Sequence, residues 1–212
     1  PFAVVGVATE NRHLRVAGQA GVAVDLPMGT LLGKLPRMQR SAQSGMLPST
    51  QTPRPEFDLK QSIERVLRLP AVASKKFLIT IGDRSVGGMT LRDQMVGPWQ
   101  VPVADYALTA AGYAGTAAEA MAMGERSPVA MRHPAASARL AVVESVTNIL
   151  GSGVAQLEDI RLSCNWMAAA GEDDQNSALL AAVEAAGREL CPALGLAVPV
   201  GKDSLSMQTR WT

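Results

Sequence analysis

The chain has few of the residues that build metal clusters or disulfide scaffolds. Its 212 residues include only two cysteines, Cys164 and Cys191, and two histidines. No CxxC pair occurs, and both histidines lie far from the cysteines in sequence, which argues against a zinc site. Two cysteines in a chain of this length fit a reducing compartment, and we expect both to be buried structural residues.

Aromatic residues and net charge are also scarce. Aromatics make up 4% of the chain and the formal net charge is +1, so electrostatic capture of nucleic acid or of an anionic membrane surface is not expected. No apolar run approaches the length of a membrane span. The chain begins with Pro1 and ends with Thr212, and we therefore expect a piece of a longer cytoplasmic protein.

What is abundant is small and aliphatic. Hydrophobic residues reach 47%, carried by Ala, Val, Leu and Met, which indicates Ala-rich helices packed closely on a sheet. Expected helices cover residues 58–69, 117–124, 134–150 and 175–190. Expected strands cover 2–9, 13–16, 22–26, 77–81, 103–109, 160–166 and 196–200, with 13–16 able to pair with 2–9 as a hairpin. This order predicts the α/β (α+β) class, a mixed sheet covered by helices.

The chain divides at a polar, Pro-rich stretch. Residues 40–57 show no periodicity, which is typical of a linker or an exposed loop. We therefore expect an N-terminal segment of residues 1–39, a linker over 40–57, and an α/β domain over 58–212.

The run from Ile81 to Asp105 has a composition that core packing does not explain. It combines a predicted strand end, four glycines, charged residues and two prolines. A strand followed by a Gly-rich loop and an acidic residue is what a phosphate and metal site requires.

Two further polar residues lie on the predicted helix 134–150. Glu144 and Asn148 are four positions apart, which places them on one helix face. The flanks of Glu144 are apolar, and a carboxylate in such surroundings needs a partner. A divalent cation held by Glu144, Asn148 and Asp105 would provide one, because Mg²⁺ prefers oxygen ligands. The alternative is that the pair lies on a solvated stripe of the helix.

A short polar sequence, Gly-Lys-Asp-Ser, follows the last expected strand. Lys202 can neutralise a phosphate and Ser204 can donate to it, although a simple turn explains the same residues. The segment does not match a P-loop, because Leu196 stands where that motif requires glycine.

Several longer segments resemble one enzyme family in their order along the chain. They read GDRSVGGMTLRDQMVGPWQVPVAD, GERSPVAM, ARLAVVESVTNI, LSCNWMAAAGEDD and LAVPVGKDSLSM. They resemble the large, single-chain form of phosphoribosylformylglycinamidine synthase, an amidotransferase of purine biosynthesis. The likeness runs over nearly the whole chain, and DLPMGTLLGKLPRM extends it toward the N-terminus.

The resemblance implies the N-terminal α/β domain of an aminoimidazole ribonucleotide synthetase-like unit. Residues 1–39 would be the tail of a preceding synthetase half, and residues 58–212 the N-terminal domain of the second half. The family uses ATP, Mg²⁺ and glutamine to convert the formamide of a ribonucleotide to an amidine. Its glutaminase is a separate domain, so neither Cys164 nor Cys191 is expected to serve as that nucleophile.

The resemblance also implies roles for individual residues. Asp105, Glu144 and Asn148 match Mg²⁺ ligands of a nucleotide site, and Ala104 matches a nucleotide-contacting position. This site is expected to be structural, not catalytic, and to be completed by residues outside the chain. Lys202 and Ser204 are catalytic candidates by analogy with the small form, although that form has Gly-Asn-x-Ser where this chain has Gly-Lys-Asp-Ser.

Two functions stay open at this stage. The chain is part of an ATP-dependent amidoligase that supplies residues of an Mg²⁺–ATP or Mg²⁺–ADP site, or it is a non-catalytic scaffold with a structural nucleotide. Expected partners are the nucleotide, the ribonucleotide substrate, the other synthetase half and the glutaminase domain. Without the other half, the uncovered sheet face is expected to favour a homodimer.

Overall fold

The computed structural model describes residues 2–34, 37, 39–42, 56–82, 85, 87–209 and 211, with backbone alone at 81 and 173. The chain forms two compact units, residues 1–40 and 41–212. Most of the predicted linker, residues 43–55, lies outside the described residues. No helix of the described residues has both the length and the apolarity to cross a bilayer.

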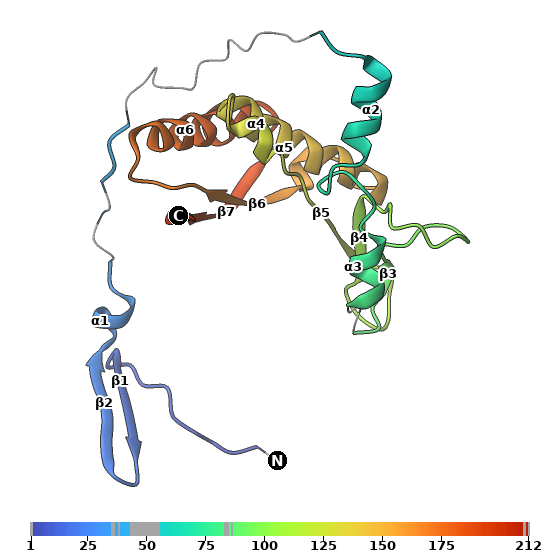
Figure 1. Cartoon of the computed structure of the whole chain (residues 1–212). Coiled ribbons are helices and arrows are strands. Elements are labelled where there is room, and N and C mark those ends of the chain that lie inside the picture. Colours follow the sequence, from blue (N-terminus) through green and yellow to red (C-terminus); the bar gives the residue numbers. More distant parts are fainter. Residues whose placement is uncertain are drawn as a thin grey trace. The chain divides into compact units, whose positions relative to one another are not determined.

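The first unit is a β-hairpin followed by one helical turn. Strand β1 (His13–Gly18) pairs antiparallel with β2 (Gly21–Pro27), and α1 (Met28–Leu32) follows directly (Figure 1). The expected strand over residues 2–9 is wrong, because the described residues there form no strand. Residues 13–16 pair instead with β2, which follows after a two-residue turn, since closing so short a loop costs little entropy.

The second unit is built around a β–α–β element. The parallel strands β6 (Arg161–Met167) and β7 (Ala197–Ser204) are joined by α6 (Asp173–Glu184). A π-helical turn, η3 (Ala185–Leu190), and the short α7 (Cys191–Ala193) continue α6. Parallel neighbouring strands need such a crossover, because the end of the first strand and the start of the second lie at opposite ends of the sheet.

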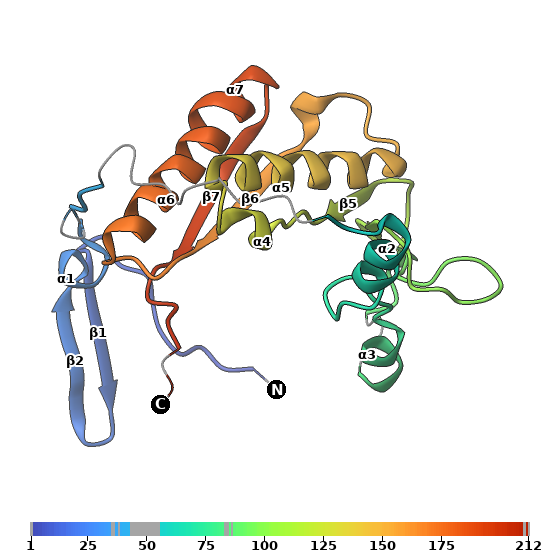
Figure 2. The ribbon, with the colours of Figure 1, turned by 45° about the horizontal axis from the view of Figure 1, so that its top comes forward.

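The core lies between these strands and helix α5 (Pro134–Ile149). Its buried members are apolar residues from five different segments: Val142, Ile160, Ala186, Cys191 and Leu196. Half-buried and exposed residues alternate along β6, and the half-buried Leu162 and Trp166 pack against this cluster. Helices α5 and α6 lie side by side over the two strands (Figure 2).

A second, antiparallel sheet lies near the C-terminal end of α5. It consists of β3 (Thr90–Arg92), β4 (Tyr106–Ala110) and β5 (Ala118–Ala122), with β4 in the middle. The remaining helical elements are α2 (Leu59–Leu67), α3 (Lys76–Ile81), α4 (Ser127–Ala130), η1 (Leu150–Ser152) and η2 (Leu157–Asp159).

The structure confirms the helices predicted with clear end signals. In α2, the Asp58 carboxylate accepts from the Gln61 backbone N–H at 2.7 Å, as an N-cap residue does. Helix α5 begins at Pro134, where the missing N–H costs little. The predicted α/β class with helices covering a sheet is therefore present, although the strands form separate sheets.

Three local predictions are wrong. The expected strand 77–81 belongs to helix α3, whose backbone hydrogen bonds form within the segment itself and need no neighbouring strand. The expected helix 117–124 contains strand β5, because pairing with β4 overrides the helix propensity of alanine. The expected polar loop 201–204 belongs to β7, which stays in register with β6 up to the pair Met167 and Ser204.

Candidate functional site

The β4–β5 register brings Asp105 beside the end of β5. The last pair of this ladder joins Tyr106 and Ala122, so Asp105, directly before β4, adjoins Met123, directly after β5. Asp105 is exposed and Ala104 is half-buried. The Ala104 N–H donates to the Gln94 carbonyl at 3.3 Å, which fixes the chain just before the carboxylate.

Asn148 ties helix α5 to the same corner. Its Nδ2 donates to the Met123 carbonyl at 3.0 Å, across 25 positions of sequence. This bond orients the amide and leaves Oδ1 without a hydrogen-bond donor among the described residues. Asn148 therefore contacts the backbone of the residue that Asp105 adjoins by the strand register.

Glu144 binds the next residues along the same segment, Glu125 and Arg126. Its Oε2 accepts from the Glu125 backbone N–H at 2.9 Å and forms an ion pair with Arg126 Nη1 at 2.6 Å. The Glu144 side chain is 25% exposed, so it does not lie on a freely solvated stripe. The partner expected for this carboxylate is thus supplied, on one oxygen, by the chain itself.

A glycine allows this close contact between segment and helix. A Cβ added to Gly124 would lie 1.9 Å from the Ala141 carbonyl oxygen and 2.6 Å from the Ser145 nitrogen. Both are backbone atoms of α5, so only glycine fits here without separating the two elements. The approach places the Met123 carbonyl and the Glu125 N–H within reach of Asn148 and Glu144.

Side chains of β3 and β4 support the start of β4. The Arg92 guanidinium lies over the Tyr106 ring at 4.7 Å from its centroid, within the range of a cation–π contact. On the other side, the Tyr106 ring lies so close to Gly151 that an added Cβ would meet it at 2.8 Å. Asp105 therefore directly precedes a residue that is anchored to η1, the turn that follows α5.

The donor set of this corner fits an oxygen-preferring cation. Asp105 offers a carboxylate without a hydrogen-bond or ion-pair partner in the described part of the chain, and Glu144 and Asn148 each keep one oxygen unbonded there. Mg²⁺ takes such ligands and retains several waters. Across the same residues, no three His, Cys, Asp or Glu side chains converge, so a cation at this corner requires the Asn148 amide.

The two catalytic candidates lie elsewhere. Lys202 Nζ donates to Ser204 Oγ at 2.6 Å on one face of β7. In both views, the end of β7 and the β4–β5 sheet lie at opposite ends of α5 (Figures 1 and 2). The structure therefore does not bring Lys202 and Ser204 together with Asp105, Glu144 and Asn148.

Sequence reasoning missed the contribution of Glu125, Arg126 and Ser127. The Glu125 carboxylate accepts from the Ser127 backbone N–H at 2.7 Å and from the Ser127 hydroxyl, and these bonds lower its pKa, with a smaller contribution from Arg126. The signal was the polar run that follows the apolar residues 117–123, where a strand end meets a helix start.

The cysteines behave as structural residues. Cys191 is 1% exposed and belongs to the core, as expected, whereas Cys164 on β6 is only half-buried and not buried as expected. Burial raises the pKa of both thiols, so they stay protonated and unreactive near neutral pH.

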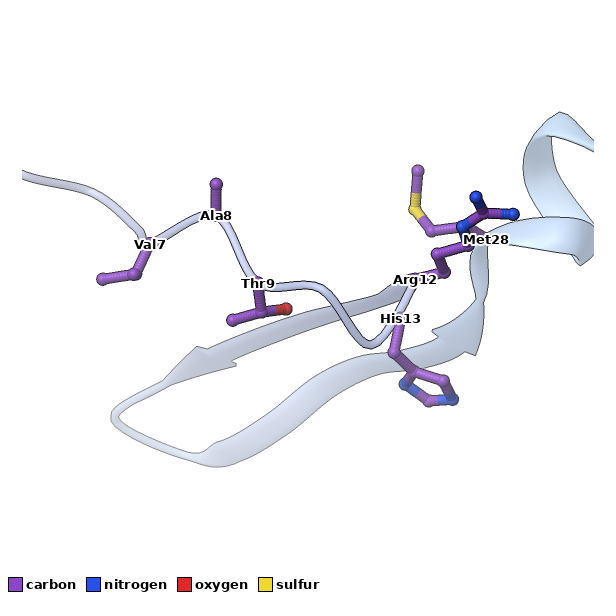
Figure 3. A pocket seen from close by; sticks show the side chains of 6 residues that line it. All are labelled: Val7, Ala8, Thr9, Arg12, His13 and Met28. Carbon is purple, nitrogen blue, oxygen red and sulfur yellow. The ribbon is translucent and has the colours of Figure 1, made fainter.

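A hollow of about 470 Å³ belongs to the first unit. It is lined by Val7, Ala8, Thr9, Arg12, His13 and Met28. The Arg12 and His13 side chains project to opposite sides of the chain (Figure 3). His13 is paired with Asp25 at 2.8 Å, so no group of reactive side chains converges in this hollow.

Comparison with known families finds a match for the domain that carries this corner. Residues 74–212 match the family described as the FGAR-AT PurM_N-like domain. The match covers every residue of the corner and the whole α5–α6–β6–β7 core. It confirms the fold as one of the aminoimidazole ribonucleotide synthetase-like superfamily, and the chain belongs to the family of phosphoribosylformylglycinamidine synthase, a ligase-type enzyme of purine biosynthesis.

Proposed function

We propose that the chain contributes one Mg²⁺–nucleotide site to an ATP-dependent amidoligase that converts formylglycinamide ribonucleotide to its amidine. The observation that carries this proposal is the corner where Asp105, Glu144 and Asn148 meet the Met123–Arg126 backbone. Four side-chain oxygens there, two of Asp105 and one each of Glu144 and Asn148, lack a partner among the described residues, and they are of the kind that Mg²⁺ prefers.

Each residue of the corner has a distinct proposed role. Glu144 and Asn148 hold the end of β5 against α5 and present one oxygen each, while Asp105 adds a second carboxylate from the start of β4. A bound Mg²⁺ would neutralise nucleotide phosphates at this place. Ala104 is proposed to contact the nucleotide through its position directly before Asp105.

A structural site is favoured over a catalytic one. The Lys202–Ser204 pair, which could act on a reacting group, lies away from the corner on β7. We therefore propose that the nucleotide held here stabilises the domain, and that Lys202 and Ser204 serve the reaction in company with another part of the enzyme. The purine-biosynthetic role carries with it a cytoplasmic location and a glutaminase that supplies ammonia.

Calorimetric titration with Mg²⁺–ADP tests the site. Glu144→Gln and Asp105→Asn should weaken binding by about tenfold or more, since each removes a charged ligand. Glu189→Gln is the control, because Glu189 pairs with Arg139 on the surface and offers nothing to the corner. Saturable binding that Glu144→Gln leaves unchanged would refute the proposed ligands.

The second candidate, a non-catalytic scaffold with a structural nucleotide, rests on exposed apolar residues of the antiparallel sheet. Met121 is 63% exposed and the neighbouring Met123 is 83% exposed. We propose that the other synthetase half covers this sheet in the enzyme and that a second copy covers it when that half is missing. Light scattering at micromolar concentration should show a dimer, and a monomeric mass would contradict this partner assignment.

A further inference from the structure

The Glu144 carboxylate already holds a cation of the chain. Arg126 Nη1 lies 2.6 Å from Glu144 Oε2, and the same nitrogen donates to the Glu125 carbonyl at 2.8 Å. The backbone of Arg126 is fixed as well, because its carbonyl accepts from Ser137 Oγ at 2.7 Å. The guanidinium thus neutralises the carboxylate whose other oxygen, Oε1, a metal ion would meet.

We propose that Arg126 is an internal counter-ion of Glu144 that competes with a divalent cation for this carboxylate. This inference rests on the proposed function, because it takes Glu144 as a ligand. A Mg²⁺ ion bound to Glu144 would lie within a few ångströms of the guanidinium, and like charges at that distance repel. A cation on the free Oε1 is therefore opposed by Arg126 on Oε2, and Arg126 turns into solvent when the ion binds.

The geometry favours competition over positioning. The Glu125 N–H holds Oε2 at 2.9 Å without Arg126, and Gly124 keeps that N–H against α5. Glu144 therefore retains its orientation when Arg126 departs. Arg126 is 45% exposed, so its long side chain can turn into water at small cost.

Arg126 consequently sets the metal affinity of the site. With the guanidinium in place, Glu144 is neutralised and the corner does not accumulate negative charge. A cation that binds must displace the guanidinium, and the free-energy cost of this displacement raises the cation concentration at which the site fills. Removing the charge of Arg126 while keeping a hydrogen-bond donor isolates this effect from loss of the contact itself.

The experiment compares Arg126→Gln with Arg126→Lys in the full chain. Mn²⁺ serves as the probe, because it shares the oxygen preference of Mg²⁺ and its free form is counted by electron paramagnetic resonance. Arg126→Gln should bind Mn²⁺ roughly tenfold more tightly at low ionic strength, with the gain shrinking as salt screens the charge. Arg126→Lys keeps the charge and should bind as the unaltered chain does.

Arg139→Gln is the matched control. Arg139 also pairs with a glutamate, Glu189. It lies on α5, the helix that carries Glu144, but away from the corner. It should leave Mn²⁺ affinity within about twofold. Circular dichroism and denaturant unfolding establish that each variant is folded before titration.

Equal or weaker Mn²⁺ binding by Arg126→Gln overturns the competition, and so does a gain of the same size in Arg126→Lys, since charge would then not be its cause. If Mg²⁺–ADP binding is lost in Glu144→Gln while Arg126→Gln changes nothing, only this inference fails. If neither the unaltered chain nor Arg126→Gln binds Mn²⁺ or Mg²⁺–ADP, the proposed function fails with it.

Discussion

Helix α5 serves two regions that are held together by different forces. Toward β6, β7 and α6 it packs apolar side chains such as Val142 into a buried cluster. Toward β5 it is joined by the hydrogen bonds of Glu144 and Asn148 and by the close approach of Gly124. No side chain of β3, β4 or β5 is fully buried. The apolar region supplies stability, whereas the polar corner keeps ligand-type groups near the surface.

The largest expected effect is the loss of unfolding free energy when a buried core side chain is truncated, compared with truncation of an exposed one on β5. Leu196→Ala removes a core side chain that is 6% exposed and should lower the free energy of unfolding by about 3 kcal/mol. In the dilute, monomeric chain, Met121→Ala on exposed β5 should change it by less than about 0.5 kcal/mol. Urea unfolding measures both. Similar losses in the two variants would mean that β5 is covered in solution.

The next prediction concerns the glycine contact of the corner. Gly124→Ala should cost about 2 kcal/mol, because the added Cβ meets backbone atoms of α5 that cannot turn aside. Gly187→Ala has open space around it and should be neutral or slightly stabilising. Denaturant midpoints compare the two variants, and an unchanged midpoint for Gly124→Ala would show that β5 does not lie on α5 this closely.

A smaller effect is expected from a single hydrogen bond of the corner. Asn148→Ala removes the donor to the Met123 carbonyl and should cost about 1 kcal/mol. The neighbouring Thr147 bonds only within its own helix and is exposed, so Thr147→Ala provides the control. Thermal unfolding without metal measures both, and equal melting temperatures for the two variants would rule out the Asn148 contact.

The smallest effect is pH-dependent. The Ser127 bonds lower the pKa of Glu125 in the folded chain, so the ionised form stabilises the fold above the unfolded pKa. This contribution is lost as the pH falls through the lowered folded value, between about pH 5 and pH 3. Ser127→Ala should therefore flatten part of the decline in melting temperature over that range. A curve parallel to that of the unaltered chain would contradict this linkage.

The apolar region was the more predictable of the two. Helix α5 and strand β6 carry periodic apolar residues and, for α5, a proline at the start, so local pattern was sufficient. Strand β5 was mistaken for a helix because its alanines and methionines favour one, and only the partner strand β4 decides otherwise. The choice depends on a contact between segments, which a local pattern does not contain.

The candidate ligands were found from spacing and family likeness, but their partners were not. The i, i+4 spacing of Glu144 and Asn148 indicated one face of a helix. In the structure both side chains contact the same segment, the one that follows β5. Nothing in the spacing reveals that Arg126 would meet Glu144, because the two are brought together by the close approach of Gly124 to α5.

The π-helical turn after α6 changes how the chain is counted. Ala186 and Cys191 are five positions apart and both belong to the buried cluster, a spacing that an α-helix would send to different faces. The wider i→i+5 turn returns them to the same side. The turn therefore acts as one extra residue inserted into a helix, and sequences of this family that lack it would carry their core residues in a different frame beyond this point.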